Sequence, residues 1–173
     1  MAENSTLFEN LQIQTGQLPQ AEEQEFVPHP DRYKRLSYIW LSIFSIILCA
    51  TWIIPVVQGE MVGFFIAFPL WLVVNSLLWL ETVKSFAIRG YLLRQHDISY
   101  RKGFLKFSLI TIPYTRIQHS EITQGPLARA MKLSTLNIFT AGGSSSDLKI
   151  PGLDPEDAQK LRTFIAEKIG KNE

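Results

Sequence analysis

Two long apolar runs, separated by a three-residue polar break, constrain this chain more than any other feature. The runs cover residues 36–57 and 61–80, and neither contains a charged side chain. A hydrocarbon core about 30 Å thick requires roughly 20 apolar residues in a helix, which each run supplies. Buried helices of a soluble core would normally keep a polar stripe for water, and neither run has one. The sequence therefore predicts a two-span transmembrane helical hairpin within residues 31–83.

Charged residues beside the runs predict how the hairpin is oriented. Basic residues precede the first run and follow the second: Arg32, Lys34, Arg35, Lys84 and Arg89. The break between the runs carries only Glu60. By the positive-inside rule, both flanks and both termini are expected in the cytoplasm.

The rest of the chain divides by charge into an acidic tail and a basic domain. Residues 1–30 hold five acidic residues and no Lys or Arg, and this polar composition predicts a disordered tail. Residues 84–173 hold 14 basic and 8 acidic residues and have room for one domain, whose charge favours anionic headgroups. The single cysteine, Cys49, lies in the first run, which excludes a disulfide framework.

Small and polar side chains within the runs indicate where helices make contact. Ser45, Gly63 and Ala67 lie on small faces that let helix backbones approach closely. Packing of the hairpin on itself is the simpler interpretation, and a face kept for another protein is the alternative. Asn75 needs a hydrogen-bond partner, so it is a candidate for a contact between chains. No ionisable side chain that could form an ion or proton route lies within either run.

After residue 84 the apolar pattern changes to a period of two, which is typical of strands. The predicted strands are residues 87–94, 98–101, 104–112, 115–123, 133–140 and 147–150. Ile117 and Ile122 fall on opposite faces of their strand, so a bulge or a twist is required to bury both. Residues 125–131 predict one short helical turn, and residues 141–146 predict a mobile loop of glycine and serine.

A helix is predicted to close the chain. Residues 154–157 combine an aspartate at the N-cap, a proline at the first helical position and acidic residues in the first turn. Ala158, Leu161 and Ile165 give this helix an apolar face. A meander of strands followed by one amphipathic helix predicts an α+β domain, with a curved antiparallel sheet or open barrel that the helix caps.

Four short motifs carry a resemblance to a known family. They cover residues 98–103, 112–118, 124–129 and 140–143, and include Gly103, Pro113, Gln118, Gln124, Gly125 and Gly142. Together they resemble the bacterial pleckstrin-homology family of YdbS-like membrane proteins, over residues 27–169. Lys132 stands where the family pattern leads us to expect a glycine, which puts the geometry of that turn in doubt.

The resemblance implies a PH-like fold for residues 84–173, with a curved antiparallel sheet and a C-terminal helix. It also implies a small protein of the bacterial cytoplasmic membrane, which works beside a larger multi-span relative with several such domains. It implies no settled biochemical activity.

No catalytic or metal-binding pattern stands out in the sequence. His29, His96 and His119 lie far apart and belong to no metal-ligand spacing, so each is expected to be an ordinary surface or strand residue. Walker loops, dinucleotide glycine patterns and nucleophile elbows do not occur. The chain is therefore predicted not to be an enzyme and to require neither metal nor cofactor.

Basic residues of the domain are the best candidates for contacts with membrane lipid or a protein partner. They are Arg94, Arg101, Lys102, Lys106, Arg116, Arg129 and Lys132. Eukaryotic PH domains hold phosphoinositide headgroups with basic residues near their first hairpin, and Arg101, Lys102 and Lys106 would lie near a comparable turn. The alternative is a solvated basic face that topology and solubility demand. Nucleic-acid binding is not expected, because these residues are not interleaved with exposed aromatic side chains.

Two functions stay open. The first is a scaffold or accessory subunit, in which a sheet edge or the Gly/Ser loop binds a second copy or a larger multi-span PH-like partner at the inner leaflet. The second is a module that senses anionic lipid through its basic face. The first is preferred, because a domain already anchored by two spans gains little targeting from lipid affinity.

Overall fold

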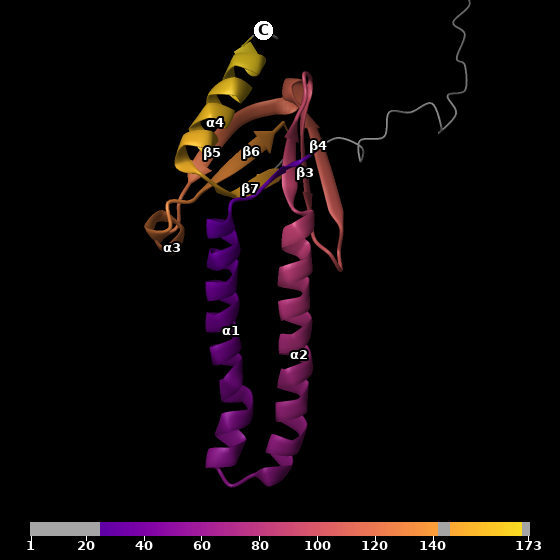
Figure 1. Cartoon of the computed structure of the whole chain (residues 1–173), viewed down its shortest axis with the longest axis vertical. Helices are drawn as coiled ribbons and strands as arrows, with labels where there is room; N and C mark the ends of the chain where they lie inside the picture. The colour runs from indigo at the N-terminus through magenta and orange to yellow at the C-terminus, as the bar shows by residue number, and fades with distance from the viewer. Residues whose placement is uncertain (1–24, 142–145, 171–173) are drawn as a thin grey trace, which may run out of the picture.

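The computed structural model describes residues 25–141 and 146–170. Two long helices form a hairpin, and a domain of antiparallel sheets stands at the open end of that hairpin (Figure 1). Most of the predicted acidic tail, and Gly142 in the predicted Gly/Ser loop, lie outside the described residues.

The hairpin consists of α1 (Asp31–Val57) and α2 (Met61–Ile88). Both helices are long and apolar enough to cross a membrane, and only 6% of the most apolar window of each is buried. A core helix of a soluble protein would be mostly covered, so this exposure fits lipid as the surroundings. The predicted two-span hairpin is confirmed, and both helices extend beyond the apolar runs.

The seam between α1 and α2 is made of aromatic rings and one close backbone approach. Trp52 packs against the rings of Phe68 and Trp71, at centroid distances of 5.3 and 6.1 Å. A Cβ atom added to Gly63 would lie 2.9 Å from the Cβ of Pro55, which is closer than such atoms approach. Gly63 therefore allows the two helices to meet near the loop that connects them.

The domain contains two antiparallel sheets. The first has the strand order β1-β2-β3-β4, with β1 (Val27–Pro28), β2 (Gly90–Leu93), β3 (Asp97–Lys102) and β4 (Ser108–Pro113). The second has the order β5-β6-β7, with β5 (Ile117–Thr123), β6 (Ser134–Thr140) and β7 (Leu148–Leu153). The short 3-10 helix η3 (Tyr114–Arg116) connects β4 of the first sheet to β5 of the second. Over the described residues, the sheets do not close into a barrel.

The helix α4 (Pro155–Gly170) covers the second sheet, and a short helix, α3 (Pro126–Ala130), connects β5 with β6. Ala158, Leu161 and Ile165 face the core, as the apolar face predicted. The predicted bulge is confirmed by a register shift in β5 between Ile117 and His119. Fully buried side chains from both sheets complete the core: Ile98, Tyr100, Leu136, Ile138, Leu148 and Ile150.

Two of the predicted strands begin three or more residues later in the structure. The strand predicted from residue 87 begins only at Gly90, because α2 continues to Ile88 and its last turn is closed by the Arg89 N–H donating to the Ser85 carbonyl. The strand predicted from residue 104 begins only at Ser108. Gly103 there has φ +86°, a left-handed conformation that ends β3 and sends residues 104–107 into a turn.

Candidate functional site

The junction between the hairpin and the domain brings both ends of the hairpin into one sheet. The strand β1, just before α1, pairs with β2, just after α2, in the register Val27 to Tyr91 and Pro28 to Gly90. A side chain at Gly90 would meet Phe26 and the Val27 carbonyl oxygen, at 2.9 and 3.0 Å from its Cβ. Close pairing of these two short strands therefore depends on glycine at position 90.

His29 lies buried at this junction, with 6% of its surface exposed. Its ring is 5.1 Å from the ring of Tyr33 and 5.7 Å from that of Tyr100, and its Nε2 atom is 3.3 Å from the Tyr100 hydroxyl. Burial and then the positive charge of Arg89 lower the pKa of His29 to about 4, so the ring is neutral at pH 7. The prediction of an ordinary surface or strand histidine was wrong at this position. The other two fit it: His96 is exposed, and His119 is exposed on β5 against Phe139.

Arg89 and Tyr33 connect the two helices to the domain. Arg89 donates hydrogen bonds to the Ser85 hydroxyl at 3.1 Å and to the Tyr33 hydroxyl at 3.0 Å. The Tyr33 ring lies directly on the backbone of Gly152 in β7, where an added Cβ would be 2.1 Å from the ring. Gly152 also has φ +73°, which favours glycine. The sequence signal for this contact was the glycine within an apolar strand.

A cleft of about 660 Å³ opens beside the start of α1. Its basic lining residues are Arg32, Arg129 and Lys132, and its acidic ones are Asp154, Glu156 and Asp157. Arg32 is already paired with Asp154, at 2.6 Å between Nη2 and Oδ1. The cleft thus offers charges of both signs, which suits a zwitterionic or peptide-like ligand better than a purely anionic one.

The turn before β6 keeps the geometry that the family pattern leads us to expect. Lys132 has φ 54°, so this lysine adopts the left-handed backbone conformation that the expected glycine would favour. Gln124 supports it by donating hydrogen bonds to the Leu133 carbonyl at 3.2 Å and the Ser134 hydroxyl at 2.8 Å. Gly125 precedes Pro126 at the start of α3.

The basic candidates do not gather on one face. Arg94 pairs with Asp97 at 2.6 Å, and Arg116 is exposed beside the end of β4. The guanidinium of Arg101 lies over the Phe26 ring, 4.1 Å from its centroid. The remaining residues are exposed in two places, Lys102 and Lys106 at the β3–β4 turn and Arg129 and Lys132 at the cleft. One common headgroup site for all seven is therefore not formed.

A groove of about 230 Å³ follows the outer edge of β4. It is lined by Ile110, Thr111, Ile112, Pro113, Arg116, Thr140 and Asp147. The Asp147 carboxylate accepts hydrogen bonds from the Thr140 hydroxyl and backbone N–H, at 2.7 and 2.9 Å, and these lower its pKa. Gln118, the remaining motif residue, is exposed at the bulge of β5.

The intramembrane candidates lie along the seam of the hairpin. The Ser45 carbonyl accepts a hydrogen bond from the Trp71 indole at 3.4 Å, and Ala67 borders a small apolar hollow of about 170 Å³. Asn75 is only 7% exposed, and its amide donates to the Trp71 carbonyl at 3.1 Å. The suggested contact of Asn75 between chains is therefore corrected, because its own hairpin buries this side chain.

Comparison with known proteins identifies the family. The sequence pattern described as "Bacterial PH domain" matches residues 36–169, which includes both spans and the domain. The chain belongs to this family. It is 29% identical to the UPF0699 transmembrane protein YdbS of Bacillus subtilis (strain 168), over 74% of this chain and 84% of that protein. No solved structure matches the chain.

The bacterial PH domain is therefore part of a membrane protein. The exposed apolar helices, the family match and the transmembrane relative all support this statement. Over residues 25–141 and 146–170, no group of three or more His, Cys, Asp or Glu side chains is placed to hold a metal ion. The family and the relative's name also describe no catalytic activity.

Proposed function

We propose that the chain is a membrane-anchored scaffold or accessory subunit. Its PH-like domain assembles with a second copy, or with a larger multi-span PH-like partner, at the inner leaflet of the bacterial cytoplasmic membrane. Both termini then lie in the cytoplasm, as the basic residues flanking the spans favour.

The outer edge of β4 is the observation that carries this proposal. β4 ends its sheet, and within the described ranges no strand pairs with its second edge. An unpaired edge presents backbone N–H and C=O groups to which an extended segment of another chain can add. The groove along this edge offers the half-buried Ile110 for apolar contacts and the exposed Arg116 for an acidic side chain.

The test is purification of the full chain from native membranes in a mild detergent, at low and high salt, followed by mass determination of the intact complex. We expect an assembly larger than one chain that survives high salt, because strand pairing and apolar contacts are weakly screened. A single chain at both salt concentrations, with no bound protein, would contradict the proposal.

Two variants locate the contact on the domain. Thr111 is exposed on β4, and Lys149 is exposed on β7. Thr111→Glu and Lys149→Gln each lower the net charge by one, so they are matched in charge. We expect Thr111→Glu to reduce the assembled fraction at least tenfold and Lys149→Gln to leave it unchanged. Equal effects of both variants on the assembled fraction would show that β4 is not part of the contact.

A lipid-sensing module is the second candidate, and the cleft beside α1 is the observation that favours it. Arg32, Arg129 and Lys132 would attract an anionic headgroup into this cleft at the start of α1. Three carboxylates share the cleft, however, and this weakens the attraction. Phosphatidylglycerol that co-purifies with a single chain and is removed by high salt would support lipid sensing instead of the scaffold.

A further inference from the structure

The turn between β3 and β4 exposes a concentrated apolar surface. Phe104, Leu105 and Phe107 are 43%, 65% and 52% exposed. Among the described residues outside α1 and α2, Val27 and Leu93 are the only other large apolar side chains with such exposure. Three of these five side chains thus lie in one turn of four residues, and a gathered apolar patch of this kind marks a contact surface.

Hydrogen bonds from α2 hold this turn in place. The two carboxylate oxygens of Glu81 accept hydrogen bonds from the backbone N–H groups of Phe104 and Leu105, at 3.1 and 2.7 Å. The buried Ser85 hydroxyl accepts a third from the N–H of Gly103, at 3.1 Å. Because the backbone is fixed to a membrane helix, the exposed side chains have a defined position relative to the hairpin.

The turn also has a defined depth. Glu81 directly follows the apolar run 61–80 and is four residues closer to the membrane than Ser85. An α-helix rises 1.5 Å per residue. The backbone N–H groups that bond to Glu81 therefore lie up to about 6 Å closer to the membrane than the Gly103 N–H that bonds to Ser85. Figure 1 shows this connection descending beside α2, away from the rest of the domain. The turn therefore reaches the level at which the apolar surface of the helix begins.

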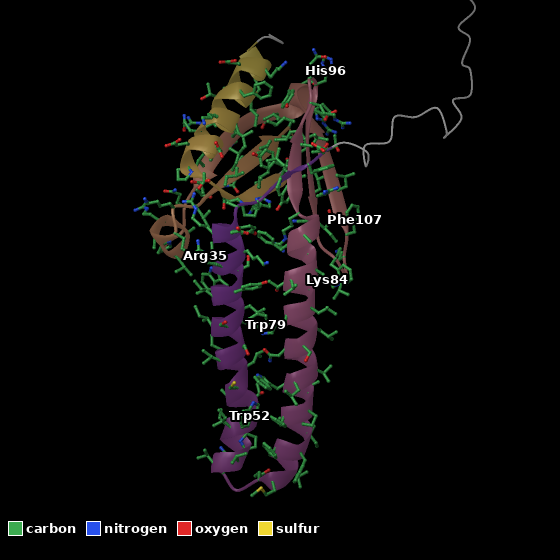
Figure 2. The ribbon with its side chains drawn as sticks, viewed as in Figure 1. Arg35, Trp52, Trp79, Lys84, His96 and Phe107 are labelled. Carbon is green, nitrogen blue, oxygen red and sulfur yellow. The ribbon has the colours of Figure 1, made fainter. Side chains whose placement is uncertain are left out.

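The surroundings of the turn are those of a membrane interface. Figure 2 shows Phe107 beside the domain end of α2, somewhat closer to the domain than Arg35 and Lys84, whereas His96 lies at the far end of the domain. Lys102 and Lys106 are exposed at the turn itself. Apolar side chains with cations beside them suit the boundary between acyl chains and phosphate headgroups.

We propose that residues 104–107 insert into the lipid interface beside α2 and form a third membrane contact in addition to the two spans. The occupant of the apolar patch is the lipid of the leaflet nearest the domain. Phe104, Leu105 and Phe107 contact the acyl-chain boundary, and the two lysines contact phosphates. This contact restrains how the domain rotates about the hairpin, and it does not depend on the proposed scaffold function.

Spin labelling of the full chain in lipid nanodiscs tests the contact, with nanodiscs of phosphatidylethanolamine and phosphatidylglycerol. Cys49 is first replaced by serine, because it is the single cysteine of the chain. A nitroxide is then attached at Leu105→Cys, at Phe107→Cys, or at His96→Cys as the exposed control. The measurement compares collision of each label with oxygen, which concentrates in lipid, and with a water-soluble nickel chelate.

We expect the labels at 105 and 107 to collide more with oxygen than with nickel, and the label at 96 to show the reverse order. Nickel accessibility at 105 equal to that at 96 would overturn the proposal. A label at 105 that is shielded from both reagents, but becomes accessible when each disc holds a single chain, would also overturn the proposal. A second copy of the chain would then cover the apolar patch. Thermal unfolding of each labelled variant confirms that the domain is folded.

Glu81→Ala provides a second test of the same geometry. It removes the acceptors of two backbone hydrogen bonds without touching the apolar side chains. We expect the label at 105 to become more mobile and more accessible to nickel, with the label at 96 unchanged. An unchanged depth of the label at 105 would show that Glu81 does not position the turn.

Discussion

The hairpin carries its large apolar side chains on the outside, whereas the domain carries them inside. Ile46 and Ile47 of α1 are 71% and 63% exposed, while Leu136 and Ile138 of β6 are fully buried. Lipid is as apolar as these side chains, so the outer face of the hairpin requires apolar character but no particular shape. The core of the domain requires both, because it is closely packed.

The largest expected effect comes from truncating an aliphatic side chain to alanine in each of the two regions. Leu136→Ala should lower the free energy of unfolding of the domain by about 2–5 kcal/mol, because it leaves a cavity in a closed core. Ile46→Ala also truncates an aliphatic side chain, but lipid fills the space, and we expect little change. Urea unfolding of both variants in bicelles measures the difference. A loss of more than about 2 kcal/mol for Ile46→Ala would mean that another protein surface covers α1.

The junction is sensitive to pH in one direction. His29 has its pKa lowered from 6.5 to about 4 in the folded protein, so the unfolded chain binds the proton more tightly. Its stabilisation is complete above pH 6.5 and should be lost as the pH falls through 4, amounting to about 3 kcal/mol. His29→Gln removes this titration. Urea midpoints of both proteins between pH 7 and 4 measure it, and identical pH profiles would contradict the assignment.

Gly152→Ala is expected to loosen the contact between the two regions by about 2–3 kcal/mol. The added methyl group meets the Tyr33 ring, and the left-handed backbone at position 152 adds strain. Gly125→Ala is the matched control, since Gly125 has φ −72° and nothing lies within 4 Å of an added Cβ. Thermal unfolding should separate the two variants, and equal melting temperatures would rule out a tight contact at Tyr33.

The smallest effect concerns the seam of the hairpin. Gly63→Ala places a methyl group against Pro55 and should weaken the association of α1 with α2 by about 1 kcal/mol. Val62→Ala, at a position 73% exposed, is the neighbouring control. Steric trapping of doubly labelled hairpins measures the separation free energy. A larger loss of separation free energy for Val62→Ala than for Gly63→Ala would show that α2 contacts α1 through the face that carries Val62.

The features that were predicted correctly are those that depend on residues within one segment of the chain. The two spans, the bulge in β5 and the inward face of α4 follow from periods and caps within single segments. The four family motifs likewise predicted the PH-like domain, because each is a short local segment.

Contacts between distant segments explain what the sequence did not reveal. Residues 104–107 lie in a segment whose apolar residues alternate as in a strand. The left-handed backbone of Gly103 ends β3, however, and hydrogen bonds to Glu81 and Ser85 of α2 hold these residues in a turn. The environment of His29 depends on the pairing of β1 with β2 across the whole hairpin. The seven basic residues were grouped by sequence, but the fold separates them: Arg129 and Lys132 line the cleft beside α1, whereas Arg116 lines the groove along β4.

The pairing of β1 with β2 has a mechanical consequence. It joins the beginning of α1 to the end of α2, so the helices are prevented from splaying apart at the end that carries the domain. In a bilayer thinner than its spans, we expect the hairpin to tilt as one body. The domain is fixed to both helices and leans with them, so a change in bilayer thickness becomes a change in the angle that its surface makes with the membrane plane.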